Sequence, residues 1–429
     1  MHRCWLRIML ASSMAPQAFG FPVSAETPVE TYTLTEALHK ATLNNAVLQS
    51  AEQDITIAKQ RVKEARYLFY PEIGLAGSAT RYDARYPFAL RPGFGSLLLF
   101  PSAKDNLISG QGYMTLSLYE GRRHINTLRL AQTALKQARS KYETGKLEIV
   151  YETKKAFYHL ILAQESLSAT QELLAEVRRT SERAKMSAWE RVEAEALSSE
   201  LRAAAAEAGH RLELARLEFL KGLNRELDTP VRVEGSLESQ PADVDLQKAL
   251  VWATELRPEL QAQTYRAQMD AISVNLALGR RTPKVLLGLD YEVTGQEFPL
   301  TQNNWDATIG VRLPFSFDFW TQHRQRIAEQ RQGEIQRAEL RDQVHLEVRK
   351  AHQDLLYWRD EWPRREAEHL RLKELRDKAL SESGPSVAAL RASARLLETH
   401  MRALEALTEH ILARARLERA VGRPLPNPS

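Results

Sequence analysis

The chain has 429 residues, of which 43% are apolar and 27% charged, and its net charge is +4. Its 59 basic and 55 acidic residues are interleaved, which is typical of solvated helix faces and argues against a nucleic-acid-binding protein. Beyond the N-terminal segment, no uncharged apolar run reaches the length of about 18 residues that a membrane-spanning helix needs. Insertion into a membrane would therefore have to use strands.

The first 25 residues resemble a signal peptide. Arg3 and Arg7 precede the apolar stretch 8–15, and the small residues 23–25 offer a cleavage site. The single cysteine, Cys4, would be removed with this segment, so the exported chain would form no disulfide. The alternative interpretation is an N-terminus without fixed structure.

The chain contains an internal repeat. Residues 34–71 align without gaps on residues 246–283, with matches that include Leu34 with Leu246 and Pro71 with Pro283. A repeat of this kind predicts a fold that is built twice, over residues 26–230 and 231–429.

Each half begins with the same predicted elements. A short helix (35–44; 246–255) precedes a longer one (47–68; 258–279), and a proline then ends the helical run. Apolar and polar residues alternate with a period of two in the segments that follow, around 73–79, 114–118, 285–294 and 305–313. This alternation predicts two strands in each half, each with one apolar and one polar face.

Very long helices follow the strands, from about Asn126 to Lys185 and from about His323 to Leu380, where Pro363 should introduce a kink. Each would be roughly 80–90 Å long. Return helices are predicted over 189–220 and 387–421, with apolar residues at the spacing of four and three that is typical of coiled coils.

Four strands cannot close a barrel in a membrane, because such barrels start at about eight strands. An open strand edge in lipid would leave backbone groups without hydrogen bonds. The sequence therefore predicts that several chains assemble into one tube, with strands at one end and helices along the rest.

From Tyr32 to Pro426 the chain resembles the TolC-like outer-membrane efflux proteins. The resemblance rests on the order and length of the elements, together with the opening segment 32–38, the strand exit 118–123 and the closing segment 417–422. It implies a mainly α protein with a membrane β portion: two tandem repeats of long coiled-coil hairpins, plus four strands contributed to a shared trimeric β-barrel.

The resemblance also implies a function. The protein would be a passive outer-membrane duct, not an enzyme and without a cofactor, with its helical tunnel in the periplasm. It would work with a periplasmic adaptor and an inner-membrane pump to export small molecules such as drugs or metal ions. Export of polypeptides by type I secretion is the alternative within this class.

Candidate site residues lie at the turns between the long helices and the return helices. The family often has acidic residues at these periplasmic turns, and Glu190 and Glu193 fall near such positions in the first. In the second turn Ala388 and Arg391 stand where the best-known member has acids. We hypothesise that Arg391 pairs with one of the glutamates and holds the entrance shut. Ordinary solvated helix ends are the alternative.

Two further groups of residues are expected near the membrane. The link between the first two strands, 83–111, is much longer than its counterpart 295–304, and we expect its apolar part at the extracellular mouth. That part includes Phe94, Leu97, Leu98, Leu99 and Phe100. Near the strand ends, an aromatic girdle at the lipid–water boundary is predicted, formed by Trp305, Phe315, Phe319 and Trp320, with core packing as the alternative.

The sequence shows no catalytic constellation. His345 and His352 are separated by two helical turns, roughly 10 Å, which is too far for both to bind one metal ion without further ligands. Two function classes remain as alternatives to a channel. A periplasmic adaptor would need lipoyl-like and barrel domains around one hairpin, and a soluble coiled-coil scaffold would need no membrane-type strands.

Overall fold

The structure, a computed structural model, describes residues 29–81, 106–183, 187–239, 244–295, 297–314, 318–384 and 386–426. The predicted signal peptide, the apolar part of the long link and Phe315 lie outside these residues.

The same order of elements occurs twice along the chain. The first copy comprises β1 (Glu30–Tyr32), α1 (Leu34–Asn44), α2 (Ala46–Tyr67), β2 (Glu72–Arg81), β3 (Asn106–Glu120), α3 (Arg123–Arg183) and α4 (Ala188–Gly222). The second comprises β4 (Val231–Val233), α5 (Leu246–Leu256), α6 (Pro258–Gly279), β5 (Lys284–Gly295), β6 (Gln302–Arg312), α7 (Phe319–Ser383) and α8 (Val387–Val421). The predicted elements are present, but β3 begins at Asn106, before the expected end of the link at residue 111.

Local sequence signals set several helix ends. Thr33 and Glu36 form a capping box at the start of α1, and the Asn45 side chain caps α2. Pro258 occupies the first turn of α6, where its missing N–H costs nothing. Gly422 ends α8 in a left-handed conformation.

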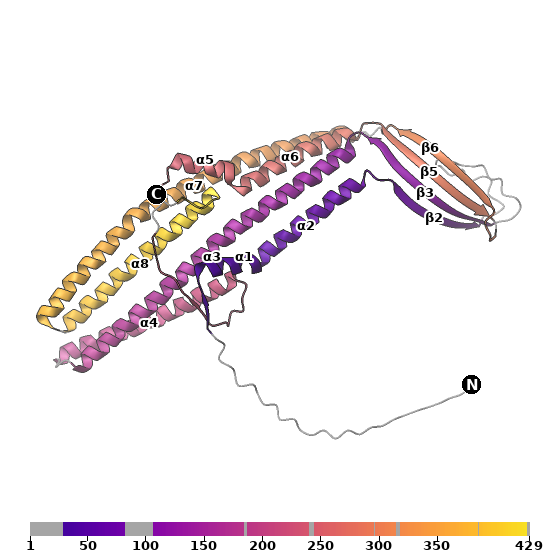
Figure 1. Cartoon of the computed structure of the whole chain (residues 1–429). Helices are drawn as coiled ribbons and strands as arrows, with labels where there is room; N and C mark the ends of the chain where they lie inside the picture. The colour runs from indigo at the N-terminus through magenta and orange to yellow at the C-terminus, as the bar shows by residue number, and fades with distance from the viewer. Residues whose placement is uncertain are drawn as a thin grey trace, which may run out of the picture.

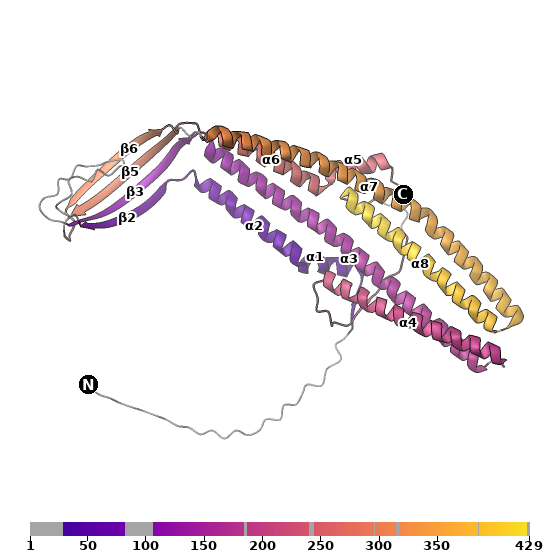
Figure 2. The same cartoon turned by 180° about the vertical axis from the view of Figure 1, so that it is seen from behind.

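The long helices form an elongated body with the strands at one end (Figures 1 and 2). α2, α3, α6 and α7 lie side by side in that order, and α3 and α7 each continue into a hairpin with α4 and α8. α7 is one helix through Pro363, and Figure 1 shows it running first beside α6 and then beside α8. The turns that join α3 to α4 and α7 to α8 are called the tips below.

β2, β3, β5 and β6 form one antiparallel sheet in that order, so the two repeats meet between β3 and β5. β1 and β4, which precede the short helices α1 and α5 in the chain, pair in parallel.

The body is held by apolar clusters between helices. Phe157, Phe219 and Tyr32 pack at the base of the α3–α4 hairpin, beside the β1–β4 pair. Val348, Leu355 and Leu417 pack at the base of the α7–α8 hairpin. A third cluster, which includes Val177, Leu201 and Leu390, joins the two hairpins closer to the tips.

Candidate functional site: a two-faced sheet and a charged tip

The four-stranded sheet has one apolar face. Residues directly opposite each other in an antiparallel sheet share a face. One row across the sheet is Leu75, Gly112, Tyr291 and Trp305, and the neighbouring row on the same face is Ile73, Met114, Leu289 and Ala307. Leu75 is 90% exposed and Trp305 is 73% exposed, so this face is uncovered in a single chain.

The other face of the sheet is polar. Its rows include Tyr113, Asp290 and Asp306, and then Gln111, Glu292 and Asn304. The Gln111 Nε2 amide donates a hydrogen bond to Asp290 Oδ1 at 2.9 Å, and the hydroxyls of Ser78 and Ser109 lie 2.8 Å apart. A sheet with these two faces separates an apolar medium from an aqueous one.

Two girdle candidates at the strand–helix junction differ in burial. Trp320 is 59% exposed, but Phe319 is only 6% exposed. The Phe319 ring is stacked on His323, and the Arg281 guanidinium lies 4.8 Å from its centroid. For Phe319 the burial favours the alternative, core packing, because its ring lies against His323 and Arg281.

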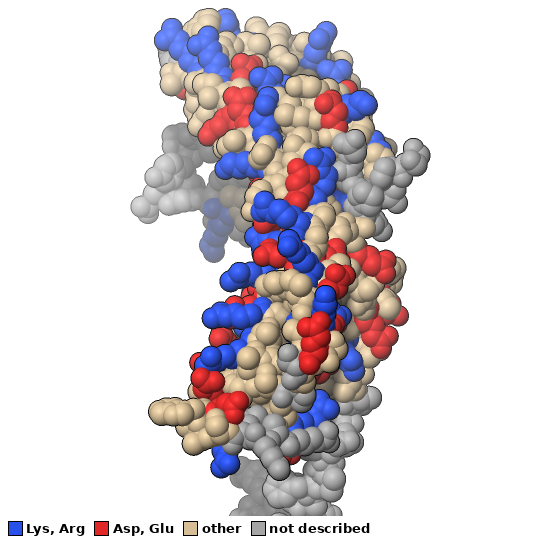
Figure 3. Space-filling view, turned by 90° about the vertical axis from the view of Figure 1, so that its left-hand side faces the viewer, with Lys and Arg blue, Asp and Glu red and all other residues tan. Residues whose placement is uncertain are grey.

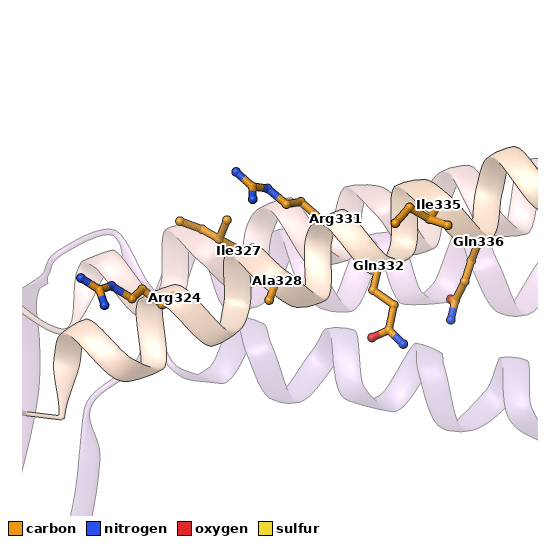
Figure 4. Close-up of a pocket in the computed structure, with 7 residues that line it drawn as sticks. All are labelled: Arg324, Ile327, Ala328, Arg331, Gln332, Ile335 and Gln336. Atoms are coloured by element: carbon orange, nitrogen blue, oxygen red, sulfur yellow. The ribbon is translucent and has the colours of Figure 1, made fainter.

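The sheet and the helical layer end in free edges on the same two sides. Among the residues that the structure describes, β2 and β6 have no strand neighbour on their outer side, and the adjoining helices α2 and α7 are the outer members of the helical layer. Along α7, a groove of about 710 Å³ is lined by Arg324, Ile327, Ala328, Arg331, Gln332, Ile335 and Gln336 (Figure 4). Ile335 is 69% exposed, so this edge offers apolar surface as well as charge.

At the tips, the structure brings two of the three candidate entrance residues together. Arg391 Nη2 lies 2.9 Å from Glu193 Oε1, which joins α8 to α4. The side chains of Arg391 and Glu193 are 63% and 41% exposed, so water screens the pair. Lys or Arg and Asp or Glu side chains are interspersed on the side of the molecule seen in Figure 3.

Glu190 has a different partner. Its carboxylate accepts a hydrogen bond from the Ser187 backbone N–H at 2.8 Å, while the Ser187 hydroxyl accepts one from the Glu190 N–H at 3.3 Å. This capping box begins α4, and its backbone hydrogen bond lowers the pKa of Glu190. The Ser-x-x-Glu pattern at 187–190 is the sequence signal that could have identified this role.

Ion pairs at the base of α8 were not expected from the sequence. Lys154 Nζ lies 2.7 Å from Glu418 Oε2, and Arg419 Nε lies 2.8 Å from Glu148 Oε2. Both pairs join α8 to α3, that is, the second repeat to the first. The base of the α7–α8 hairpin is thus held by less exposed contacts than its tip.

The two histidines considered as metal ligands have separate partners. His345 Nε2 lies 3.3 Å from Thr254 Oγ1, and His352 Nε2 lies 2.9 Å from the Val244 carbonyl oxygen. In the described part of the chain, no three His, Cys, Asp or Glu side chains gather where they could hold a metal ion. Across the same residues, no helix has the length and apolar character needed to cross a bilayer.

Solved structures with the same fold include outer-membrane channels. The Campylobacter jejuni CmeC channel aligns with 92% of this chain and 87% of its own length, at a TM-score of 0.77 and 14% identity. The Neisseria gonorrhoeae MtrE channel, in an open state, aligns with 92% of this chain and 90% of its own, at 0.74 and 17%. A Pseudomonas aeruginosa membrane protein aligns with 90% and 92%, at 0.75 and 19%. Among curated protein sequences, none matches the chain.

The fold of the chain is thus the fold of these solved channels, with long helices along most of the molecule and a strand portion at one end. Residues 37–219 also match the sequence model of the outer membrane efflux protein family. This match covers less than half of the chain, in its first repeat.

Proposed function

We propose that the protein is a passive outer-membrane exit duct, assembled from three copies of the chain. In this arrangement the strands form one barrel in the outer membrane, and the long helices form a tunnel in the periplasm. An inner-membrane transporter and a periplasmic adaptor would supply the energy and the cargo.

The two-faced sheet with its two free edges carries this proposal. The apolar row through Leu75, Tyr291 and Trp305 suits lipid, and the polar row through Asp290 and Asp306 suits a water-filled lumen. β2 and β6 can satisfy their outer backbone groups in lipid only by pairing with β6 and β2 of other copies.

The outer helices α2 and α7 are also suited to closing three copies into one tube. Measured from the strand junction at 1.5 Å per residue, Asp54 and Ile57 of α2 lie about 15–20 Å along the body, and Ile327 and Arg331 of α7 lie about 12–18 Å along it. Apolar and oppositely charged side chains would thus meet at the same level when α7 of one copy lies beside α2 of the next.

The purified protein is expected to be a trimer in detergent by light scattering. Ile335→Asp should shift the population toward monomer, because it puts a charge into the groove of α7, where Ile335 is 69% exposed in a single chain. Val192→Asp, at an exposed position near a tip, is the matched control and should leave the trimer intact. A monodisperse folded monomer of the parent protein would overturn the proposed assembly.

The exported cargo is proposed to be a small molecule such as a drug or a metal ion. The open MtrE structure and the CmeC structure, both described as outer membrane channels, support a channel over an adaptor or a soluble scaffold. Type I protein secretion remains the second candidate, since a tunnel of this fold does not itself select cargo.

The Arg391–Glu193 pair is proposed to latch the periplasmic entrance. As an exposed pair it contributes about 0.2–1 kcal/mol per chain. Three copies would bias the closed state by about 0.6–3 kcal/mol, or about three- to 150-fold in population. Arg391→Glu should therefore raise single-channel conductance in planar bilayers at low salt, where screening is weak.

A second charge reversal, at Glu193, supplies the control. Glu193→Arg added to Arg391→Glu should restore part of the closure, because the pair is re-formed with opposite polarity. Glu190→Gln should not raise the single-channel conductance as Arg391→Glu does, since it weakens the cap of α4 but leaves the Arg391–Glu193 pair in place. If Arg391→Glu conducts like the parent, the tip residues are only solvated helix ends.

A further inference from the structure

Three histidines lie between α7 and α8, and neither the sheet nor the tip pair uses them. His369 of α7 and His400 of α8 have their ring centroids 4.8 Å apart, with the planes tilted by 37°. His410 is 2% exposed, and its ring lies 6.2 Å from that of Trp362 on α7. This section of the hairpin, 362–369 on α7 with 400–410 on α8, is called the histidine seam below.

The hydrogen bonds of the seam suit neutral imidazoles. His369 Nδ1 lies 3.3 Å from the Thr399 hydroxyl, which donates its own proton to the Leu396 carbonyl oxygen at 2.9 Å. In this arrangement a neutral His369 can donate through Nδ1 to the Thr399 hydroxyl, although a hydrogen bond with the Leu396 backbone raises the pKa of His369. His410 Nδ1 is buried, and it has no hydrogen-bond partner within the described part of the chain. A proton added to His410 would thus create a cation inside the helix contact.

Most charged groups around the seam oppose protonation. Lys373 of α7 faces both His369 and His400, and Arg359 of α7 and Arg414 of α8 face His410. Glu165 of α3 is the carboxylate that favours a charged His400. His369 and His400 would also repel each other if both were charged.

Burial, followed by these cations, lowers the pKa of His369 and His410 below the ordinary value. Burial also lowers the pKa of His400, against the pull of Glu165. A histidine whose pKa is lower in the packed state binds fewer protons there than in an opened state. Its contribution to packing is therefore complete above about pH 6.5 and is lost as the pH falls below that value.

We propose that the histidine seam is an acid-sensitive joint, at which α7 separates from α8 as the pH falls below about 6.5. The seam is close to the tip, because Arg391 precedes His400 by only nine residues, about 14 Å along α8. The base of α8 stays anchored through Lys154–Glu418 and Arg419–Glu148. Loosening of the seam therefore releases the end that carries Arg391 from α7, and leaves it held only by the Leu390 cluster and the Arg391–Glu193 pair.

The joint itself stands on the contacts of one chain. Its effect on the entrance rests on the latch proposed above. The two parts make separate predictions, one for the exchange of backbone amides in the hairpin and one for conductance.

Amide hydrogen exchange of the assembled protein in detergent tests the joint. Protection factors, corrected for the intrinsic pH dependence of exchange, should fall in segments 364–380 and 393–410 between pH 7.5 and 5.5. The expected fall is up to about tenfold for each histidine, because pH 5.5 lies about one unit below the ordinary pKa of histidine. Segments 140–160 of α3, at the anchored base, should change much less.

Replacing the three histidines by glutamine (H369Q, H400Q and H410Q together) should abolish this acid-dependent fall, because glutamine does not titrate. The single variant His400→Gln should reduce it and serves if the triple variant does not fold. His210→Gln, at an exposed position on α4, is the matched control and should behave like the parent. An equal fall in parent and triple variant, or no fall in the parent, would overturn the joint.

Single-channel recording at the same two pH values tests the link to the entrance. The parent should conduct more at pH 5.5 than at pH 7.5, and the triple variant should show a smaller rise. If the seam loosens but conductance does not change with it, the link to the entrance is wrong and the joint stands. A protein that forms no channel would refute the proposed function while leaving the exchange result intact.

Discussion

Gly121→Ala is expected to prevent normal assembly. Gly121 turns β3 into α3 with a φ of +61°, a backbone conformation that costs an L-residue about 1–2 kcal/mol. An added Cβ would lie 1.5 Å from Thr282 Oγ1 and 2.8 Å from the Gly279 carbonyl oxygen. The second contact involves backbone, so it cannot be relieved by a side-chain rotation. We expect little or no heat-resistant oligomer in membrane extracts, measured by electrophoresis without boiling.

Gly110→Ala is the matched control. Gly110 lies on the same strand, and an added Cβ would meet no atom within 4 Å in a single chain. This variant should assemble at close to the parent level. Removing the hydroxyl in Gly121→Ala with Thr282→Ala should recover only part of the loss, because Gly279 still obstructs the Cβ. Normal assembly of Gly121→Ala would contradict the close approach of Gly121 to Gly279 and Thr282.

Phe157→Ala is expected to cause the largest loss of helix packing. Phe157 is 1% exposed, and its ring centroid lies 5.6 Å from that of Tyr158 and 6.1 Å from that of Phe219. Removing a buried ring of this size costs about 3–5 kcal/mol through lost burial and the cavity left behind. Thermal unfolding followed by circular dichroism should show a clearly lower midpoint.

Trp189→Ala provides the comparison for this measurement. Trp189 is also aromatic and belongs to the same hairpin, but it is 80% exposed near the tip. Its replacement should change the free energy of unfolding by no more than about 0.5 kcal/mol. Equal destabilisation by the two variants would contradict the placement of the core at the base of the hairpin.

Most of the elements could be predicted from the sequence because their signals are local. The period of two in residues 285–294 and the spacing of four and three in 387–421 indicated one strand and one helix, and both are present. Prolines at 71 and 283 marked helix ends within a few residues. The alternation also indicated an apolar and a polar face for each strand, and the register places like faces together.

The candidate site could be predicted only in part. The sequence indicated that Arg391 could meet Glu190 or Glu193, and the structure pairs it with Glu193. The choice depends on Ser187, whose capping box uses the carboxylate of Glu190. The role of the pair as a latch remains a prediction.

What the sequence alone determined is most of the elements and their order in two copies, since periodicity and helix caps act over a few residues. The need for other chains stays a prediction. The tertiary structure decided the strand order, in which β3 meets β5, and the burial of Phe319. It also decided that His369 faces His400, and that Lys154 reaches Glu418 over 264 positions of sequence. Such contacts depend on how two helices are rotated and shifted against each other. That relation is set by the packing of all their side chains together, and no local pattern in either segment encodes it.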